Sequence, residues 1–140
     1  MRRSRLIALA CLLLCVPSCK RPTSGELFLG APRNSYDFPI VVEDSLAFYD
    51  FSFYTRMDGE ERVQEPLRFD ISWVSPADTI YRETVYMYAG DENGRLQRYR
   101  SYVRFPACGE WMLKVSVSPQ TDGFRGLGFI WKERRWDTTN

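Results

Sequence analysis

Few side chains in this 140-residue chain could perform catalysis, and histidine is absent from all of it. Asp50 and Asp70 could act as the paired carboxylates of a glycoside hydrolase if their strands were neighbours. Both, however, occupy the polar phase of an alternating strand pattern, which indicates solvent-facing charge. Cys108 has no histidine to activate it, and no basic residue lies closer in the sequence than Arg104. We therefore predict no catalytic residues and a non-enzymatic protein.

A metal site is also not predicted. Asp91, Glu92 and Asn93 bring oxygen ligands together, but the spaced continuation of a calcium loop does not follow them. The same residues, with Gly94, have the composition of a hairpin turn. We expect no metal and no cofactor.

The clearest chemistry lies at Cys19, which closes the first apolar run. Met1–Arg5 carries three arginines, Leu6–Val16 is an apolar run of eleven residues, and Ser18 places a small residue before the cysteine. This order resembles a bacterial lipoprotein signal peptide, in which the cysteine receives acyl chains such as palmitate and becomes the first mature residue. A spanning helix needs about 20 apolar residues, so the run is a targeting segment and not a membrane span.

Two other cysteines precede Cys19. Cys11 has almost no apolar core before it, and Cys15 follows the bulky Leu14, so Cys19 is the predicted lipidation site. The alternative is an ordinary secretory signal with a chance cysteine. If Cys19 is lipidated and residues 1–18 are removed, Cys108 remains alone and no internal disulfide can form.

Charge and the residue after the cysteine predict a location. Lys20 replaces the aspartate that retains enteric lipoproteins in the inner membrane, and no acidic cluster of the surface-export kind follows. We expect a lipid anchor in the outer membrane, facing the periplasm. Removing Arg2, Arg3 and Arg5 lowers the formal charge from +1 to −2, which argues against nucleic-acid binding.

The remainder of the chain is predicted to be all β-sheet. Apolar and polar residues alternate over 46–55, 67–73 and 111–117, and turn residues separate these runs. We predict a single immunoglobulin-like antiparallel β-sandwich of about seven strands over residues 37–136, with a tail at 137–140. Residues 19–36 are predicted to be the lipidated cysteine and a flexible tether, with a short edge strand at Leu27-Phe28-Leu29 as the alternative.

A basic and aromatic stripe is the candidate binding surface. The segments 79–88 and 96–105 flank Asn93-Gly94, which predicts a hairpin. Such a stripe could bind an acidic partner segment, a lipopolysaccharide phosphate or a glycan. The alternative is a solvated face on which arginine stems cover tyrosine rings. The hairpin alignment places these residues on one face: Arg82, Tyr86, Tyr88, Arg98, Arg100, Tyr102 and Arg104.

Four segments carry a resemblance to a known family: 75–80, 102–111, 114–117 and 126–133. They resemble the GldH family of gliding-motility lipoproteins from Bacteroidota, and the similarity spans most of residues 37–134. The family's tryptophan-glycine segment in the middle is missing here. The resemblance implies an outer-membrane lipoprotein associated with gliding motility or type IX secretion. We accordingly expect a subunit or assembly factor of an envelope complex with a protein partner; the alternative is a surface lipoprotein that binds carbohydrate.

Overall fold

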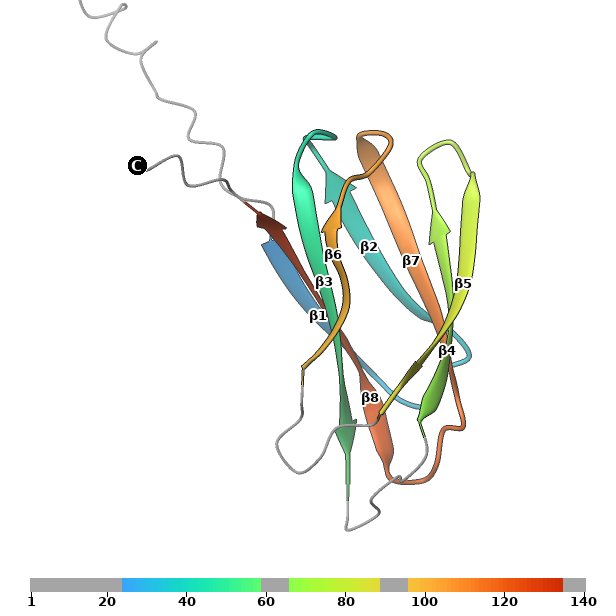
Figure 1. Ribbon diagram of the computed structural model, residues 1–140. Helices are drawn as coiled ribbons and strands as arrows, with labels where there is room; N and C mark the ends of the chain where they lie inside the picture. The colour runs from blue at the N-terminus through green and yellow to red at the C-terminus, as the bar shows by residue number, and fades with distance from the viewer. Residues whose placement is uncertain (1–23, 59–65, 89–95, 135–140) are drawn as a thin grey trace, which may run out of the picture.

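The computed structural model describes residues 24–58, 66–88 and 96–134, which form two antiparallel sheets of four strands packed face to face (Figure 1). The predicted all-β sandwich is therefore confirmed, with eight strands and not about seven. The strands are β1 (Ser24–Gly30), β2 (Tyr36–Val42), β3 (Phe48–Met57), β4 (Leu67–Val74), β5 (Ile80–Met87), β6 (Gln97–Val103), β7 (Gly109–Ser118) and β8 (Phe124–Arg134).

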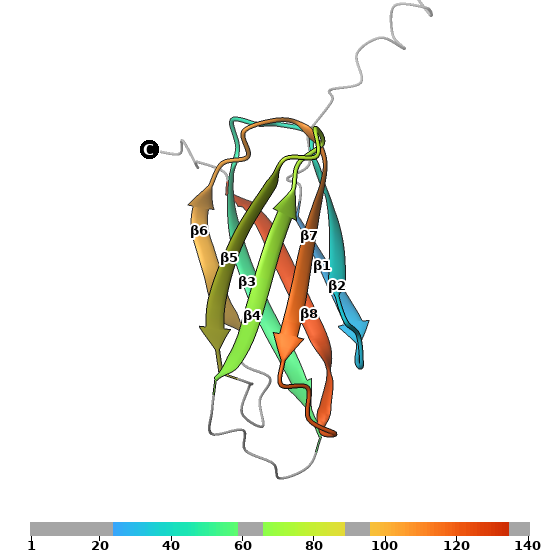
Figure 2. The same cartoon turned by 90° about the vertical axis from the view of Figure 1, so that its right-hand side faces the viewer.

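The strand order shows that the chain crosses repeatedly between the sheets. One sheet has the order β1-β8-β3-β6 and the other the order β2-β7-β4-β5. Among the described strands, only β4 and β5 are consecutive in the chain and paired with each other. Their turn is held by the Ser75 amide, which donates to the Thr79 carbonyl at 2.8 Å, and by Asp78, whose φ of 62° reverses the chain. Figure 2 shows the β2-β7-β4-β5 sheet in front of the other.

Period-two alternation produces the core as predicted. In β3, Tyr49, Phe51 and Phe53 are almost completely buried, and the residues between them are more exposed. The same alternation buries Leu67, Phe69 and Ile71 of β4. Because the two inner faces are rich in aromatic residues, the core is a network of ring contacts. For example, the ring centroids of Phe51 and Phe129 are 5.5 Å apart.

The prediction of a tether over residues 19–36 was wrong for Ser24–Gly30, which forms β1, and for Tyr36, which begins β2. The edge-strand alternative describes this segment better. All seven residues of β1 pair with β8, and Leu27 and Leu29 pack against the core. Glycine made the segment look irregular, yet Gly25 lies under the Trp131 ring, where a Cβ would approach within 2.2 Å of that ring. β8, about 100 residues further along the chain, provides the strand pairing that the local sequence of this segment does not predict.

The predicted hairpin of segments 79–88 and 96–105 was also wrong. β5 pairs with β4, whereas β6 pairs with β3 in the other sheet. The two strands are the edges of opposite sheets and face each other across one side of the sandwich (Figure 1). The Asn93-Gly94 turn itself lies outside the described residues, as does the Asp91-Glu92-Asn93 cluster.

Cys19 and the preceding signal likewise lie outside the described residues, so lipid attachment stays a prediction. Within 24–58, 66–88 and 96–134, no helix has the length and apolar character needed to cross a bilayer. Cys108 is free and exposed in the turn before β7, where its thiol lies 3.4 Å from the Glu43 carbonyl oxygen.

Candidate functional site

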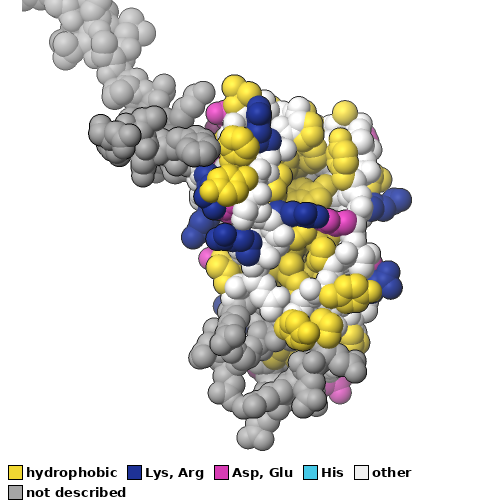
Figure 3. Space-filling model, in the orientation of Figure 1, with side chains coloured by type: hydrophobic (Ala, Val, Ile, Leu, Met, Phe, Trp, Pro, Cys, Tyr) yellow, Lys and Arg dark blue, Asp and Glu magenta, His cyan; other side chains and the backbone are white. Residues whose placement is uncertain are grey.

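An aromatic cavity of about 200 Å³ opens on the side of the sandwich where β5 and β6 face each other. Figure 3 shows this side hollowed and lined by apolar side chains, with a basic and an acidic side chain meeting across the hollow. The lining residues come from both sheets and from the β6–β7 connection. They are Phe51, Trp73, Tyr81, Glu83, Tyr99, Arg100, Val103, Arg104, Phe105, Pro106 and Trp111.

Packed rings form the walls of the cavity. Phe105 lies at the centre of this cluster, with ring centroids 5.1 Å from Trp111, 5.7 Å from Trp73 and 5.7 Å from Phe51. At the rim, the half-exposed Tyr81 stacks on Trp111 at 6.2 Å with an interplanar angle of 28°. Because Phe51 and Phe105 also belong to the main core, the cavity is an extension of that core towards solvent.

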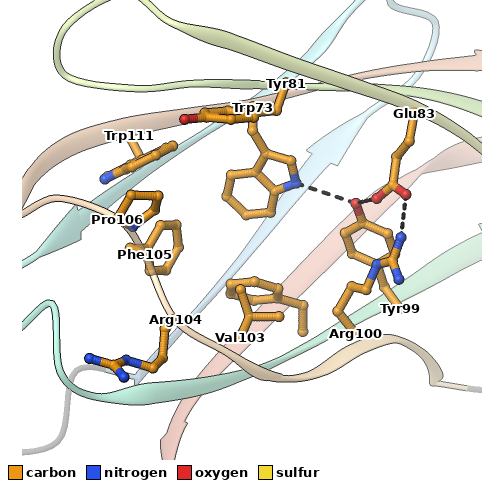
Figure 4. Close-up of a pocket in the computed structure, with 11 residues that line it drawn as sticks. Trp73, Tyr81, Glu83, Tyr99, Arg100, Val103, Arg104, Phe105, Pro106 and Trp111 are labelled. Atoms are coloured by element: carbon orange, nitrogen blue, oxygen red, sulfur yellow. Dashed lines mark hydrogen bonds and ion pairs between the residues drawn. The ribbon is translucent and has the colours of Figure 1, made fainter.

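A polar network joins the two edge strands across the cavity mouth (Figure 4). The Trp73 indole N–H donates to the Tyr99 hydroxyl at 3.3 Å, and this hydroxyl donates in turn to the Glu83 carboxylate. The Arg100 guanidinium donates to the other oxygen of Glu83 and forms an ion pair with it. Each of these four residues thus directs a polar group at another member of the network, and the remaining wall of the cavity is mainly apolar.

This network changes the acidity of its members. Burial raises the pKa of Tyr99 to about 12, and the hydrogen bond to Glu83 adds to the effect because a negative neighbour disfavours the phenolate. The same carboxylate raises the pKa of Arg100 through a hydrogen bond and charge attraction. The Tyr99 phenol therefore remains a donor at every physiological pH.

We expect the chain to lose stability as pH rises from about 10 to about 12. The Tyr99 pKa is raised on folding, so the folded state holds this proton more tightly than the unfolded state does. Its contribution to stability is complete below the unfolded pKa and is lost as pH rises through the folded value. The measurement is phenolate absorbance against pH, alongside unfolding midpoints. In Tyr99→Phe one late-ionising phenol should disappear; an unchanged titration curve would contradict the assignment.

The structure does not bring the predicted stripe together on one face. Arg82 and Tyr86 lie on the outer face of β5, and Arg98 lies on the outer face of β6, which belongs to the opposite sheet. The prediction that these residues share one face was wrong, because it assumed that β5 and β6 pair as a hairpin. Arg100 is displaced by a bulge, since the pairing of β3 with β6 shifts register on both sides of Phe51. This shift carries Arg100 to the cavity mouth.

Tyr102 belongs to a separate cluster on the outer face of the β1-β8-β3-β6 sheet, and Arg104, which also lines the cavity, extends its guanidinium to this cluster. Tyr102 has a φ of 55°, and its amide donates to the Asp50 carboxylate at 3.2 Å. Arg134 lies 3.9 Å from the centroid of the Tyr102 ring and donates to Asp50 at 2.6 Å. The Arg104 guanidinium lies 5.5 Å from the centroid of the Phe48 ring. These cationic contacts rigidify the outer face beside β6.

The acid pair considered from the sequence does not converge. Asp50 lies on β3 and binds Arg134, whereas Asp70 lies on β4 in the other sheet. A hydrogen bond from Thr84, with help from Arg68, lowers the pKa of Asp70. Among the described residues, no group of three or more histidine, cysteine, aspartate or glutamate side chains is placed to hold a metal ion.

Of the cavity residues, the sequence pointed only to Arg100 and Arg104, although one signal also pointed to Glu83. Glu83 occupies the inward phase of β5, between Tyr81 and Val85, where a charged residue is unusual unless it is paired. Tyr99 similarly lies between two arginines, on the inward phase of β6. Their contact requires two strands from different sheets, which the alternation of either strand alone does not reveal.

Comparison with known proteins adds little to this description. No family model matches the chain, and no curated protein matches it. Among solved structures, it is similar to the carbohydrate-binding module TmCBM61, solved in complex with β-1,4-galactotriose. The TM-score is 0.37 at 13% sequence identity, over 81% of this chain and 70% of that chain. A likeness of this size carries no argument about what this chain binds.

Proposed function

We propose that this chain is an outer-membrane lipoprotein that acts as a non-enzymatic subunit or assembly factor of an envelope complex. The proposal combines the lipoprotein-like signal ending at Cys19 with the resemblance to the GldH family. The structural observation that supports it is the open side between β5 and β6. Exposed tyrosine and arginine side chains surround the cavity there, and these residue types are enriched where proteins bind proteins.

Photo-cross-linking in intact cells tests this function. Benzoylphenylalanine would replace Tyr86 or Leu96, which are 64% and 53% exposed and flank the open side. Controls matched in exposure are Val41 and Leu46, which are 51% and 70% exposed and lie on β2 and in the connection between β2 and β3. We expect a discrete protein adduct from the first pair only. Absence of an adduct, or the same adducts from all four positions, would refute the proposal.

The anchor makes a separate prediction. Replacing Cys19 by alanine removes the only cysteine that both a small residue and an adequate apolar core precede. We expect Cys19→Ala to lose labelling by a clickable palmitate analogue completely, and to accumulate as the unprocessed chain. Cys108→Ala is the matched control and should label normally. Full labelling of Cys19→Ala would exclude lipidation at this position.

Carbohydrate binding is a second candidate. It is favoured by the Tyr81 ring, which is half exposed and stacks on Trp111, because exposed aromatic rings form platforms for sugar rings. Against it, Glu83, Tyr99 and Arg100 already bond to one another, so a sugar hydroxyl that replaced one of these bonds would gain little. Affinity electrophoresis in soluble polysaccharides, with Tyr81→Ala as the comparison, tests this candidate.

A further inference from the structure

The four edge strands of the sandwich differ in how well they are protected against pairing with another chain. β2 carries Pro39 in its middle, and β6 is interrupted by two register shifts. β1 has glycine at Gly25 and Gly30, which weakens a strand. Proline and bulges are common devices that keep sheet edges from adding strands. β5 has neither of them, nor a glycine or a lysine, and its inward-pointing charge, Glu83, is neutralised by the ion pair with Arg100.

β5 is also the longest of these edges, with eight residues against seven in each of the others. Each of its eight residues pairs with β4 without a bulge, from Ile80 opposite Val74 to Met87 opposite Leu67. Among the described strands, none pairs with its other edge. A straight strand of eight residues therefore presents a row of backbone N–H and C=O groups that can bind a further strand.

The two strands that border the open side also carry most of the exposed large apolar side chains. The described residues include eight large hydrophobic side chains that are exposed, and six of them lie on β5, on β6 or directly at their ends. Scattered hydrophobic residues need no explanation, but a gathering on one side marks an interaction surface. The six are Ile80, Tyr81, Tyr86, Tyr88, Leu96 and Tyr102.

The size and chemistry of the cavity define what it can accept. Its volume of about 200 Å³ is below the roughly 300–1,000 Å³ of small-molecule sites. The walls are aromatic, and the Glu83, Tyr99 and Arg100 polar atoms are mutually bonded. The cavity is thus suited to a single apolar side chain from a partner, and not to an extended polar ligand.

Charge selects between a foreign segment and a second copy of this chain. Residues 80–88 and 96–104 contain four arginines and one glutamate, and that glutamate is paired with Arg100. No ion pair joins Arg82, Arg98 or Arg104 to another described residue. Two copies meeting through this side would place like charges together, whereas an acidic segment would complement them.

We propose that an extended segment of a partner protein, with alternating apolar and acidic residues, adds as a strand to the free edge of β5. An apolar side chain of the segment enters the cavity between Tyr81 and Val103, while acidic side chains on the opposite side of the segment reach Arg82. The added strand closes the open side of the sandwich. This inference rests on the proposed function and specifies how the partner is held.

A displayed peptide library tests the mode of binding. Random nonapeptides on phage would be panned against the full-length chain purified in detergent. We expect the enriched peptides to alternate apolar and acidic residues and to lack proline. The best peptide is then synthesised with N-methyl groups on its odd or on its even residues, which preserves every side chain. One form should bind at least about tenfold more weakly, because several backbone hydrogen bonds are lost, and the other should bind like the parent.

A cavity-filling variant tests the apolar anchor. Val103→Phe adds volume at the cavity wall and is expected to weaken binding of the same peptide at least about tenfold, without lowering the unfolding midpoint. Val41→Phe makes the same change on β2, away from the cavity, and should not alter affinity. Peptide affinity would be followed by the fluorescence of Trp73 and Trp111, which line the cavity.

Several results would overturn the proposal. Equal binding of the two N-methylated forms would mean that side chains alone hold the peptide. Failure to enrich any alternating peptide would refute strand addition. Competition by neutral oligosaccharides would indicate a glycan as the occupant, and a dimer that excludes the peptide would indicate a second copy of this chain. If only strand addition is wrong, cross-linking from Tyr86 and Leu96 to a partner in cells would persist. If the proposed function is wrong, that cross-linking would be absent as well.

Discussion

Replacing Arg98 and Arg104 together by glutamate is expected to abolish the cross-linked adduct formed from Tyr86 or Leu96. Both arginines are exposed beside the open side and form no ion pair with another described residue. The double reversal changes the local charge by four units, which repels an acidic partner. Folding should be nearly unaffected, with a loss of about 1 kcal/mol at most, because the main contact removed is the cation–π contact of Arg104 with the Phe48 ring.

The control for this prediction carries the same change of charge elsewhere. Lys114→Glu with Lys132→Glu alters exposed positions on β7 and β8, away from the open side. This variant should keep the adduct. Raising the salt concentration should weaken cross-linking of the unmodified chain in a membrane extract, because exposed charges are screened. If the Arg98 and Arg104 variant retained its adduct but melted early, these arginines would be structural and recognition would lie elsewhere.

Gly126→Ala is expected to lower the free energy of unfolding by about 2–5 kcal/mol, through backbone strain and overpacking. Gly126 has a φ of 152°, which L-residues rarely adopt. A Cβ there would lie 2.3 Å from the Leu29 carbonyl oxygen and 2.6 Å from the Phe28 ring. The backbone contact cannot be relieved by a change of rotamer, so β1 must move away from β8. Chemical denaturation followed by circular dichroism measures the loss.

The cross-strand partner of Gly126 provides the control. Gly30 lies directly opposite it in the β1–β8 pair, and a Cβ at Gly30 would meet only the Arg125 carbonyl oxygen at 4.0 Å. Gly30→Ala should therefore change the free energy of unfolding by less than about 1 kcal/mol. Equal losses in the two variants would mean that β1 tolerates displacement, and that the backbone contact is not what fixes it.

The candidate site exists because β5 and β6, which are edges of different sheets, both contribute to the cavity. Each strand alone would present an ordinary edge with alternating side chains. The Glu83 carboxylate, isolated on an inward face, acquires partners only because Tyr99 and Arg100 arrive from the opposite sheet. The cavity mouth is consequently a contact between sheets, and its properties depend on how the two sheets are placed.

The all-β fold class, and which side chains of the main strands face inward, could be predicted from the amino-acid pattern. Alternation in Leu67–Val74 and Gly109–Ser118 has a period of two, and each residue's face follows from that period without knowledge of its neighbours. The buried residues of these strands are accordingly those predicted. The predicted lipoprotein signal uses equally local information, because the prediction depends on a short run of residue types before Cys19.

Strand pairing and the position of the candidate site depend on contacts between distant parts of the chain, and neither could be predicted from the pattern. Ser24–Gly30 has weak strand character of its own and becomes β1 through its pairing with β8. β5 and β6 flank a hairpin-like sequence, yet they join different sheets, because burying Val85, Met87 and Tyr99 between the sheets outweighs the local preference of a turn. Strand pairing is a sum over contacts distant in sequence, and no local pattern encodes that sum.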